Sequence, residues 1–262
     1  MPTLLPPTFV PAMTLPTGAT VRKVITLGQS NALGESPTYI QNQNVPCYVR
    51  ALDEKFGRTG VWERLGSVTR DQAVPPSLIT LSSTLAKKRG ALTQASLDLV
   101  AGGKSPIMAS ICRAGTGISY WGAGQPGETA FNLYAGEIVA AAGDTNWHVV
   151  IIWGESDANA SATSAAWQTN LTAFATLVRT KFTAARIYVV QLNAAYANGA
   201  TPPDDVNWPA AVRTGNTNFV AGDGNAELLN WDAFGYATPH YTDAGYISGG
   251  SNISARVLVN QP

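Results

Sequence analysis

Short apolar runs alternate along the chain with longer amphipathic stretches. The run from Val21 to Leu27 is rich in β-branched residues and lies between Gly18 and Gly28, which is typical of a buried strand. Residues 164–182 instead carry apolar side chains at helical spacing, which predicts a helix with one buried face. The same patterns predict further strands over 107–112, 149–153, 187–192 and 226–230, and further helices over 75–88, 129–142, 209–220 and 243–259.

This alternation of strands and helices predicts an α/β fold. Strands separated by helices favour parallel pairing, so we expect a mostly parallel sheet of about five strands between two layers of helices. Such a three-layer α/β/α sandwich is flavodoxin-like. Residues 34–75 carry prolines and glycines with little periodicity, and we expect a long functional loop there. Because open α/β sheets bind ligands at the carboxyl ends of their strands, functional residues should follow strand ends.

The composition indicates a single globular domain. The 262 residues are 45% hydrophobic and 13% charged, which is enough to bury a sizeable core. We expect a proline-rich N-terminal arm over residues 1–20 and one domain over 21–262. The arm lacks the charged start and continuous apolar core of a signal peptide, and no segment approaches the ~20 apolar residues of a transmembrane helix. We therefore expect a soluble protein without a membrane partner.

The charge balance argues against functions that need a strongly charged surface. The 17 basic and 17 acidic side chains cancel, whereas nucleic-acid binding needs a clustered basic surface. Two cysteines, Cys47 and Cys112, do not make a disulfide framework. Because the two cysteines and two histidines are widely separated, we predict neither a metal site nor a cofactor.

The segment Gly28-Gln29-Ser30-Asn31 follows the first predicted strand. A serine at this point either caps the next helix or acts as a nucleophile, and a nucleophile needs a neighbouring base. His148 precedes a buried strand, at the opposite edge of the sheet, and we expect it to be structural. His240 lies in a loop that leads into the last helix, so it is the candidate base.

Two more blocks follow predicted strands. Gly115-Thr116, with Trp121 five residues after the threonine, comes after the second strand, and Gly154-Glu155-Ser156-Asp157 comes after the third. Together with the Ser30 block and with His240 and Gly245, these blocks resemble the SGNH hydrolases. The resemblance lies in both the content of the blocks and their order along the chain. The similarity is to their sialate O-acetylesterase-like and acetyl-xylan-esterase-like carbohydrate esterases, and it spans residues 24–250.

The resemblance implies acyl transfer through a covalent intermediate. Ser30 would attack the ester carbonyl, and His240 would take its proton and return it to the leaving alcohol. The backbone N–H groups of Ser30 and Gly115 match the family's oxyanion donors. Trp153 stands where the family has a glutamine donor, so its indole N–H replaces that donor only if the ring edge faces the site, and otherwise the ring packs.

The sequence departs from the family at the residue that orients the base. The family has an aspartate three residues before the histidine, and this position is Ala237 here. Three arrangements are open. Asp232 orients His240, a backbone carbonyl does so and leaves a Ser-His dyad, or the domain has lost catalysis and kept binding.

Glu155 and Asp157 have two interpretations. Paired carboxylates serve glycoside hydrolysis, but carboxylates just beyond a strand also brace a loop by hydrogen bonds, and we favour bracing.

Aromatic residues beside the proposed catalytic segments indicate the substrate. We expect Tyr120, Trp121 and Tyr241, together with Gln29, to contact it, because aromatic rings stack on sugar faces. With the resemblance, this predicts an acetylated carbohydrate. The alternative is a catalytically decayed carbohydrate-binding module on the same scaffold, for example in a viral tail or another surface protein that meets its ligand outside the cell.

Overall fold

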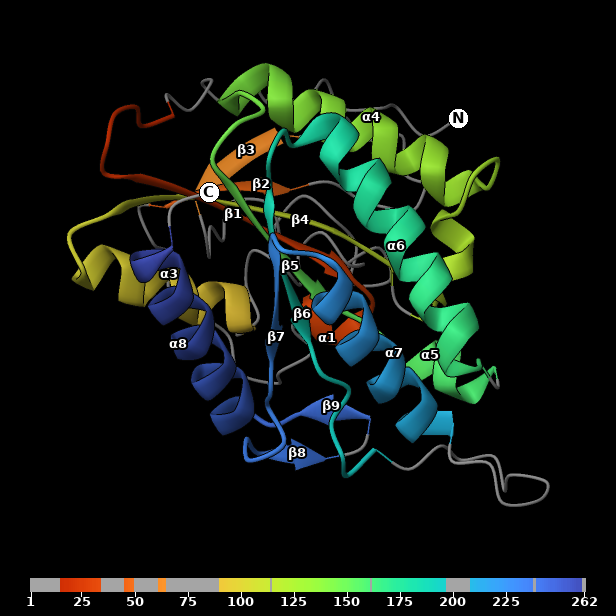
Figure 1. The fold of residues 1–262 in the computed structure, drawn as a ribbon. Coiled ribbons are helices and arrows are strands. Elements are labelled where there is room, and N and C mark those ends of the chain that lie inside the picture. The colour runs from red at the N-terminus through yellow and green to blue at the C-terminus, as the bar shows by residue number, and fades with distance from the viewer. Residues whose placement is uncertain are drawn as a thin grey trace, which may run out of the picture.

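The computed structural model describes residues 15–33, 45–49, 61–64, 90–113, 115–160, 162–196, 208–237 and 239–260. Within these residues a seven-stranded sheet runs in the order β3-β2-β4-β1-β5-β6-β7 (Figure 1). All neighbouring strands are parallel except β3, which is antiparallel to β2 at one edge. The strands are β1 (Val21–Gly28), β2 (Pro46–Val49), β3 (Val61–Arg64), β4 (Ser105–Cys112), β5 (Trp147–Ile152), β6 (Arg186–Val190) and β7 (Ala226–Leu229).

Helices cover both faces of this sheet. Side chains alternate along β1, so that Ile25 and Leu27 join one core and Val24 joins the other. The first core is closed by α4 (Pro126–Ala142), α6 (Ser164–Lys181) and α7 (Trp208–Gly222), and the second by α3 (Ala91–Ala101) and α8 (Asp243–Val259). The predicted three-layer α/β/α sandwich with a mostly parallel sheet is confirmed.

The five strands expected from the sequence all form, and two more strands join them. β2 and β3 come from the stretch that we expected to be an irregular loop, and α3 was not predicted. The helix expected over 75–88 and residues 1–14 of the expected arm lie outside the described residues.

Helices α3 and α8 approach each other closely because Gly250 carries no side chain, and Gly249 likewise leaves room for the ring of Trp231. A Cβ added at Gly250 would lie 2.5 Å from the carbonyl oxygen of Ala91, and one at Gly249 would lie 2.8 Å from the ring of Trp231. The sequence suggests that two glycines weaken this helix. Here Gly250 allows the contact with α3 and Gly249 the contact with Trp231, and α8 runs unbroken from Asp243 to Val259.

The amino end of the sheet buries His148, as expected for a structural residue. Its Nδ1 lies 3.2 Å from the hydroxyl of Tyr188, and the two rings are stacked. Burial, together with the charges of Arg22 and Arg186, lowers the pKa of His148 to about 4, so the ring is neutral at pH 7.

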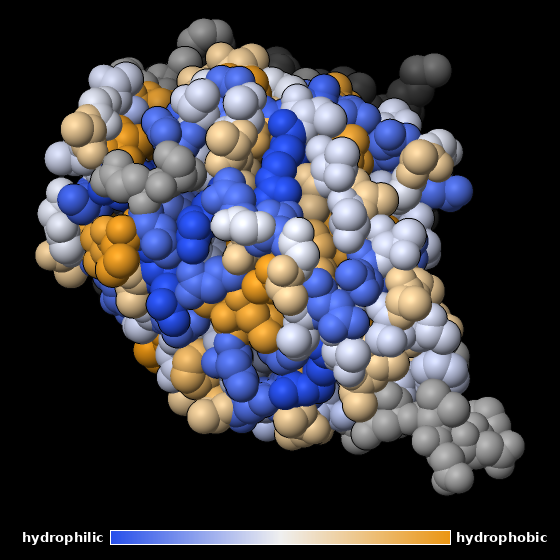
Figure 2. Space-filling model, viewed as in Figure 1, coloured by the Kyte–Doolittle hydropathy of each residue, from blue (hydrophilic) through white to orange (hydrophobic). Residues whose placement is uncertain are grey.

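The surface in Figure 2 is largely polar, and apolar residues form small separate patches on the face shown. Among the described residues, no helix combines the length and apolar character needed to cross a membrane. In the described part of the chain, the exposed large hydrophobic side chains are Val100, Leu133, Leu258 and Val259.

Gly28 ends β1 at the point where the sheet meets the predicted nucleophile. Its φ is +148°, and a Cβ there would lie 2.1 Å from the carbonyl oxygen of Ile152 in β5. Both the backbone conformation and the close approach require glycine.

We expect Gly28→Ala to lower the free energy of unfolding by at least about 2 kcal/mol, through backbone strain and overpacking. The measurement is urea unfolding followed by circular dichroism. Gly136→Ala in α4 is the matched control, because a Cβ there meets nothing within 4 Å. The control should gain about 0.5–1 kcal/mol from helix propensity. Equal midpoints for both variants would contradict the prediction.

Candidate active site

The predicted functional blocks meet at the carboxyl edge of the sheet. Strands β4, β1 and β5 are neighbours, so the segments that follow them lie side by side. These segments form α1 (Ser30–Leu33), the 3-10 helix η4 (Ile118–Trp121) and α5 (Glu155–Asn159). The hairpin of β8 (Tyr236–Ala237) and β9 (His240–Tyr241) joins them from the C-terminal part of the chain.

Ser30 is the first residue of α1 and is partly exposed. Its two neighbours, Gln29 and Asn31, are buried, with 2% and 1% of their surface exposed. The backbone therefore points the amides inward and leaves the Ser30 side chain accessible at the edge of the sheet.

Glu155 is the buried centre to which both amides bind. The amide nitrogen of Gln29 donates to its Oε2, and Nδ2 of Asn31 donates to its Oε1 at 2.5 Å. Ser156 donates to Oε1 of Gln29 at 2.6 Å. Burial raises the pKa of the Glu155 carboxyl, and the two amide hydrogen bonds oppose this shift. The Glu155 carboxyl thus braces the segment that contains Ser30.

His240 is held close to this segment through its neighbours in the chain. Nδ2 of Asn31 donates to the carbonyl of Pro239 at 3.0 Å, and the backbone N–H of Tyr241 donates to Oδ1 of Asn31 at 3.3 Å. Asn31, which follows Ser30, is thereby hydrogen bonded to the residues before and after His240. Ser30 and His240 are both described, and no hydrogen bond joins them in this state.

The segment after β4 is braced by residues that follow β5. Trp153 donates its indole N–H to the carbonyl of Thr116 at 2.8 Å, so this donor is used within the protein and is not directed at an oxyanion. Asp157 accepts the backbone N–H of Ile118, at 3.0 and 3.2 Å from its two oxygens. Gly115 lies exposed beside these supported points, with a φ of +67°.

Three residues that we expected to contact substrate are instead packed inside. Gln29 binds Glu155, Trp121 packs edge-on against Trp153, and Tyr241 packs against Trp231. No more than 4% of the surface of each residue is exposed. Burial of apolar rings and of a hydrogen-bonded amide is favourable, so these side chains pack inside the protein and do not face the substrate. Tyr120 remains partly exposed at the rim.

Tyr120 lies under an arginine at this rim. The guanidinium carbon of Arg113 is 4.7 Å from the centre of the Tyr120 ring, and Nη1 donates to the Tyr120 hydroxyl. A cation placed on an aromatic face holds the ring in one orientation.

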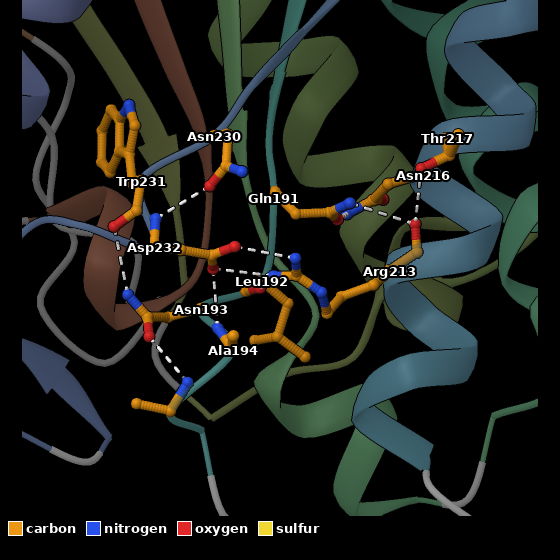
Figure 3. A network of polar contacts seen from close by, with 11 residues as sticks. Gln191, Leu192, Asn193, Ala194, Arg213, Asn216, Thr217, Asn230, Trp231 and Asp232 are labelled. Carbon is orange, nitrogen blue, oxygen red and sulfur yellow. Dashed lines mark hydrogen bonds and ion pairs between the residues drawn. The ribbon is translucent and has the colours of Figure 1, made fainter.

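Asp232, the candidate orienting acid, is bound by Arg213 (Figure 3). Two hydrogen bonds of 2.8 Å join the guanidinium to the two carboxylate oxygens, and the backbone N–H of Ala194 donates to Oδ1 at 2.8 Å. Although burial alone would raise the pKa of Asp232, the bond to Arg213 lowers it, so the carboxylate is ionised. Asp232 thereby joins the segments after β6 and β7.

Sequence reasoning placed Asn31 in the nucleophile block but gave it no role. Its contacts come from residues 124 to 215 positions away, so no local pattern reports them. The Arg213–Asp232 pair was missed for the same reason. Among the described residues, no three His, Cys, Asp or Glu side chains gather as ligands for a metal ion.

The chain matches no protein-family model and no curated protein. Solved structures do share its fold. A protein from Arabidopsis thaliana is 14% identical with a TM-score of 0.61, over 91% of this chain and 98% of that one. A carbohydrate acetylesterase from Xanthomonas citri is 13% identical with a TM-score of 0.59, over 90% of this chain and 56% of that one. A lipase/acylhydrolase from Enterococcus faecalis is 15% identical with a TM-score of 0.52, over 92% and 97%.

These neighbours define the class of the fold. The chain shares the α/β fold of these structures, which include a lipase/acylhydrolase and a carbohydrate acetylesterase, and this is the fold class that the sequence predicts.

We expect the stability of the protein to depend on pH through Asp157. Burial and the nearby Glu155 raise its pKa from 3.8 to about 7 against the opposing bond from Ile118. The pKa of Asp157 is higher in the folded state than in the unfolded state. The stability that Asp157 contributes is therefore fully present below pH ~4 and is lost as the pH rises through about 7. Relative to Asp157→Asn, the free energy of unfolding should fall by up to about 1.4 kcal/mol per pH unit across this window.

Urea unfolding at about pH 4, 5, 6 and 7 measures this difference. Using the difference between the two proteins cancels the titration of the groups that do not interact with Asp157. A difference that stays constant across this range would show that Asp157 titrates as an ordinary carboxyl.

Proposed function

We propose that this protein is a serine carboxylic ester hydrolase that removes O-acetyl groups from a carbohydrate. The observation that carries the proposal is the placement of Asn31. This residue follows Ser30 and bonds the backbone on both sides of His240, so a hydroxyl and an imidazole share one small region at the carboxyl edge of the sheet.

The proposed reaction has two halves. Oγ of Ser30 attacks the acyl carbon while His240 takes the hydroxyl proton, and the negative carbonyl oxygen accepts hydrogen bonds from the backbone N–H groups of Ser30 and Gly115. The tetrahedral intermediate collapses, His240 gives its proton to the leaving alcohol, and an acetyl-serine remains. Water then attacks with His240 as base, which releases acetate and restores Ser30.

Two observations support a carbohydrate as the alcohol. Neighbours of the same fold are described as carbohydrate acetylesterases. In this chain, Tyr120 is partly exposed beside the segment that carries Gly115, and its ring is held by Arg113. The exposed part of this aromatic residue offers a contact for a sugar at the rim.

Catalysis by a Ser-His dyad fits the chain better than a triad. Ala237 has no carboxylate, and Asp232 is committed to Arg213. The same facts favour the second candidate, a module that binds carbohydrate without cleaving it, because Ala237 has no carboxylate and that of Asp232 is hydrogen bonded to Arg213.

We expect Ser30→Ala and His240→Ala each to reduce hydrolysis of 4-nitrophenyl acetate at least about a thousandfold, since removing either member of such a pair removes nearly all of its catalysis. Acetate release from acetylated xylan should fall in parallel. Ser119→Ala, an exposed serine at the same edge, is the matched control and should retain full activity. Hydrolysis that survives Ser30→Ala would refute the assignment, and sugar binding without hydrolysis in the parent would favour the binding module.

We expect Asp232→Asn to lower kcat less than about tenfold, because its carboxylate serves Arg213 and not the base. Loss of this partly exposed ion pair should cost about 1 kcal/mol or less. Asp223→Asn, which breaks the similar pair with Arg179, is the control for a purely structural effect. A much larger loss of kcat in folded Asp232→Asn than in Asp223→Asn would identify Asp232 as the orienting acid.

A further inference from the structure

The side-chain amide of Asn31 makes four hydrogen bonds. Nδ2 donates to Oε1 of Glu155 and to the carbonyl of Pro239. Oδ1 accepts from the backbone N–H of Tyr241 and, at 3.0 Å, from the hydroxyl of Tyr246. An amide has two donor hydrogens and two acceptor lone pairs, so its capacity is used in full.

The partners also fix which way this amide points. The carbonyl of Pro239 only accepts and the N–H of Tyr241 only donates, so a flipped amide would lose both bonds. Glu155, with its carboxyl buried, accepts from the nitrogen side and reinforces the same orientation. Because Asn31 is 1% exposed, water cannot replace a lost partner, and the arrangement is costly to break.

This orientation determines where the backbone of residue 240 lies. Pro239 and Tyr241 are both bonded to one amide, and the carbonyl of Pro239 also accepts the hydroxyl of Tyr236 at 2.9 Å. His240 therefore sits on a segment that is fixed on both sides. In an ordinary triad a carboxylate holds the imidazole itself, and here Ala237 and Asp232 do not provide one.

We propose that Asn31 is the positioning residue for the base, and that it replaces the missing carboxylate by fixing the backbone around His240. The inference rests on the proposed function, in which His240 is the base. Asn31 directly follows Ser30 in the chain and is hydrogen bonded to the residues on both sides of His240. Asn31 therefore sets the positions of both the nucleophile and the base. The distance between Ser30 and His240 then depends on the side chain of Asn31. In a triad, a residue from a third loop also contributes to holding the base.

The test uses the polarity of the bonds. Asn31→Asp keeps an acceptor for Tyr241 and Tyr246 but places a second carboxylate oxygen against Glu155 and Pro239. We expect kcat for 4-nitrophenyl acetate to fall about a hundredfold, with KM changed less than about threefold, because a small misplacement of a catalytic group costs about this much. When Asn31→Asp is combined with Glu155→Gln, the glutamine amide donates to the introduced carboxylate, and kcat should recover at least about tenfold.

Asn216→Asp is the matched control for a buried amide. Asn216 is fully buried and bonds Trp167 and Gln191 away from the catalytic segments. Near-ultraviolet circular dichroism gives the folded fraction of each variant, and kcat is expressed per folded molecule. The control should lose stability and keep its kcat.

Amide hydrogen exchange provides a readout that does not depend on catalysis. In Asn31→Ala, exchange of the Tyr241 N–H should accelerate at least about tenfold, while that of Val150 in the central strand should be unchanged. Unchanged exchange at Tyr241, or faster exchange with an unaltered kcat, would overturn the inference. A parent protein that hydrolyses no ester would instead refute the proposed function, and the exchange data would still decide whether Asn31 holds the segment.

Discussion

A buried carboxyl group must be hydrogen bonded. Glu155 is such a group, and its need for donors holds several chain segments together where the sheet strands end. Removal of the Glu155 carboxyl from water is costly unless donors replace the water. The donors are the amides of Gln29 and Asn31, which flank Ser30. Separating the segments after β1 and β5 would take both amide donors from this buried carboxyl, so the position of Ser30 depends on the hydrogen bonding of Glu155.

The exit of β5 organises the other segments as well. Trp153 holds Thr116, Asp157 holds Ile118, and the backbone carbonyl of Glu155 accepts the hydroxyl of Tyr196 at 3.1 Å. The short stretch 153–157 thus fixes the segments after β4, β1 and β6. These segments share one support, and the partly exposed Ser30 and the exposed Gly115 lie between the supported points.

The sequence predicted the sheet well because buried parallel strands are continuous apolar runs, as in β1 and β5. It also placed the functional blocks at strand ends. It missed α3, whose buried Thr93 and Ser96 weaken the apolar period. Burial of Trp121 and Tyr241 was not foreseen, because an aromatic beside a site and one beneath it have the same sequence pattern. The bonds of Asn31 depend on tertiary contacts alone.

The close contact of α3 with α8 has a consequence for the order in which this protein folds. It joins residues as far apart as Asp98 and Ser251, 153 positions along the chain, so a long loop must close before the contact is gained. The β8–β9 hairpin immediately precedes α8. The sheet depends on distant pairing as well, because β1 lies between β4 and β5. The segment that carries His240 is in turn bonded to Asn31, near the other end of the described chain. Both ends of the chain must therefore be in place before Ser30 and His240 lie in the same region of the molecule.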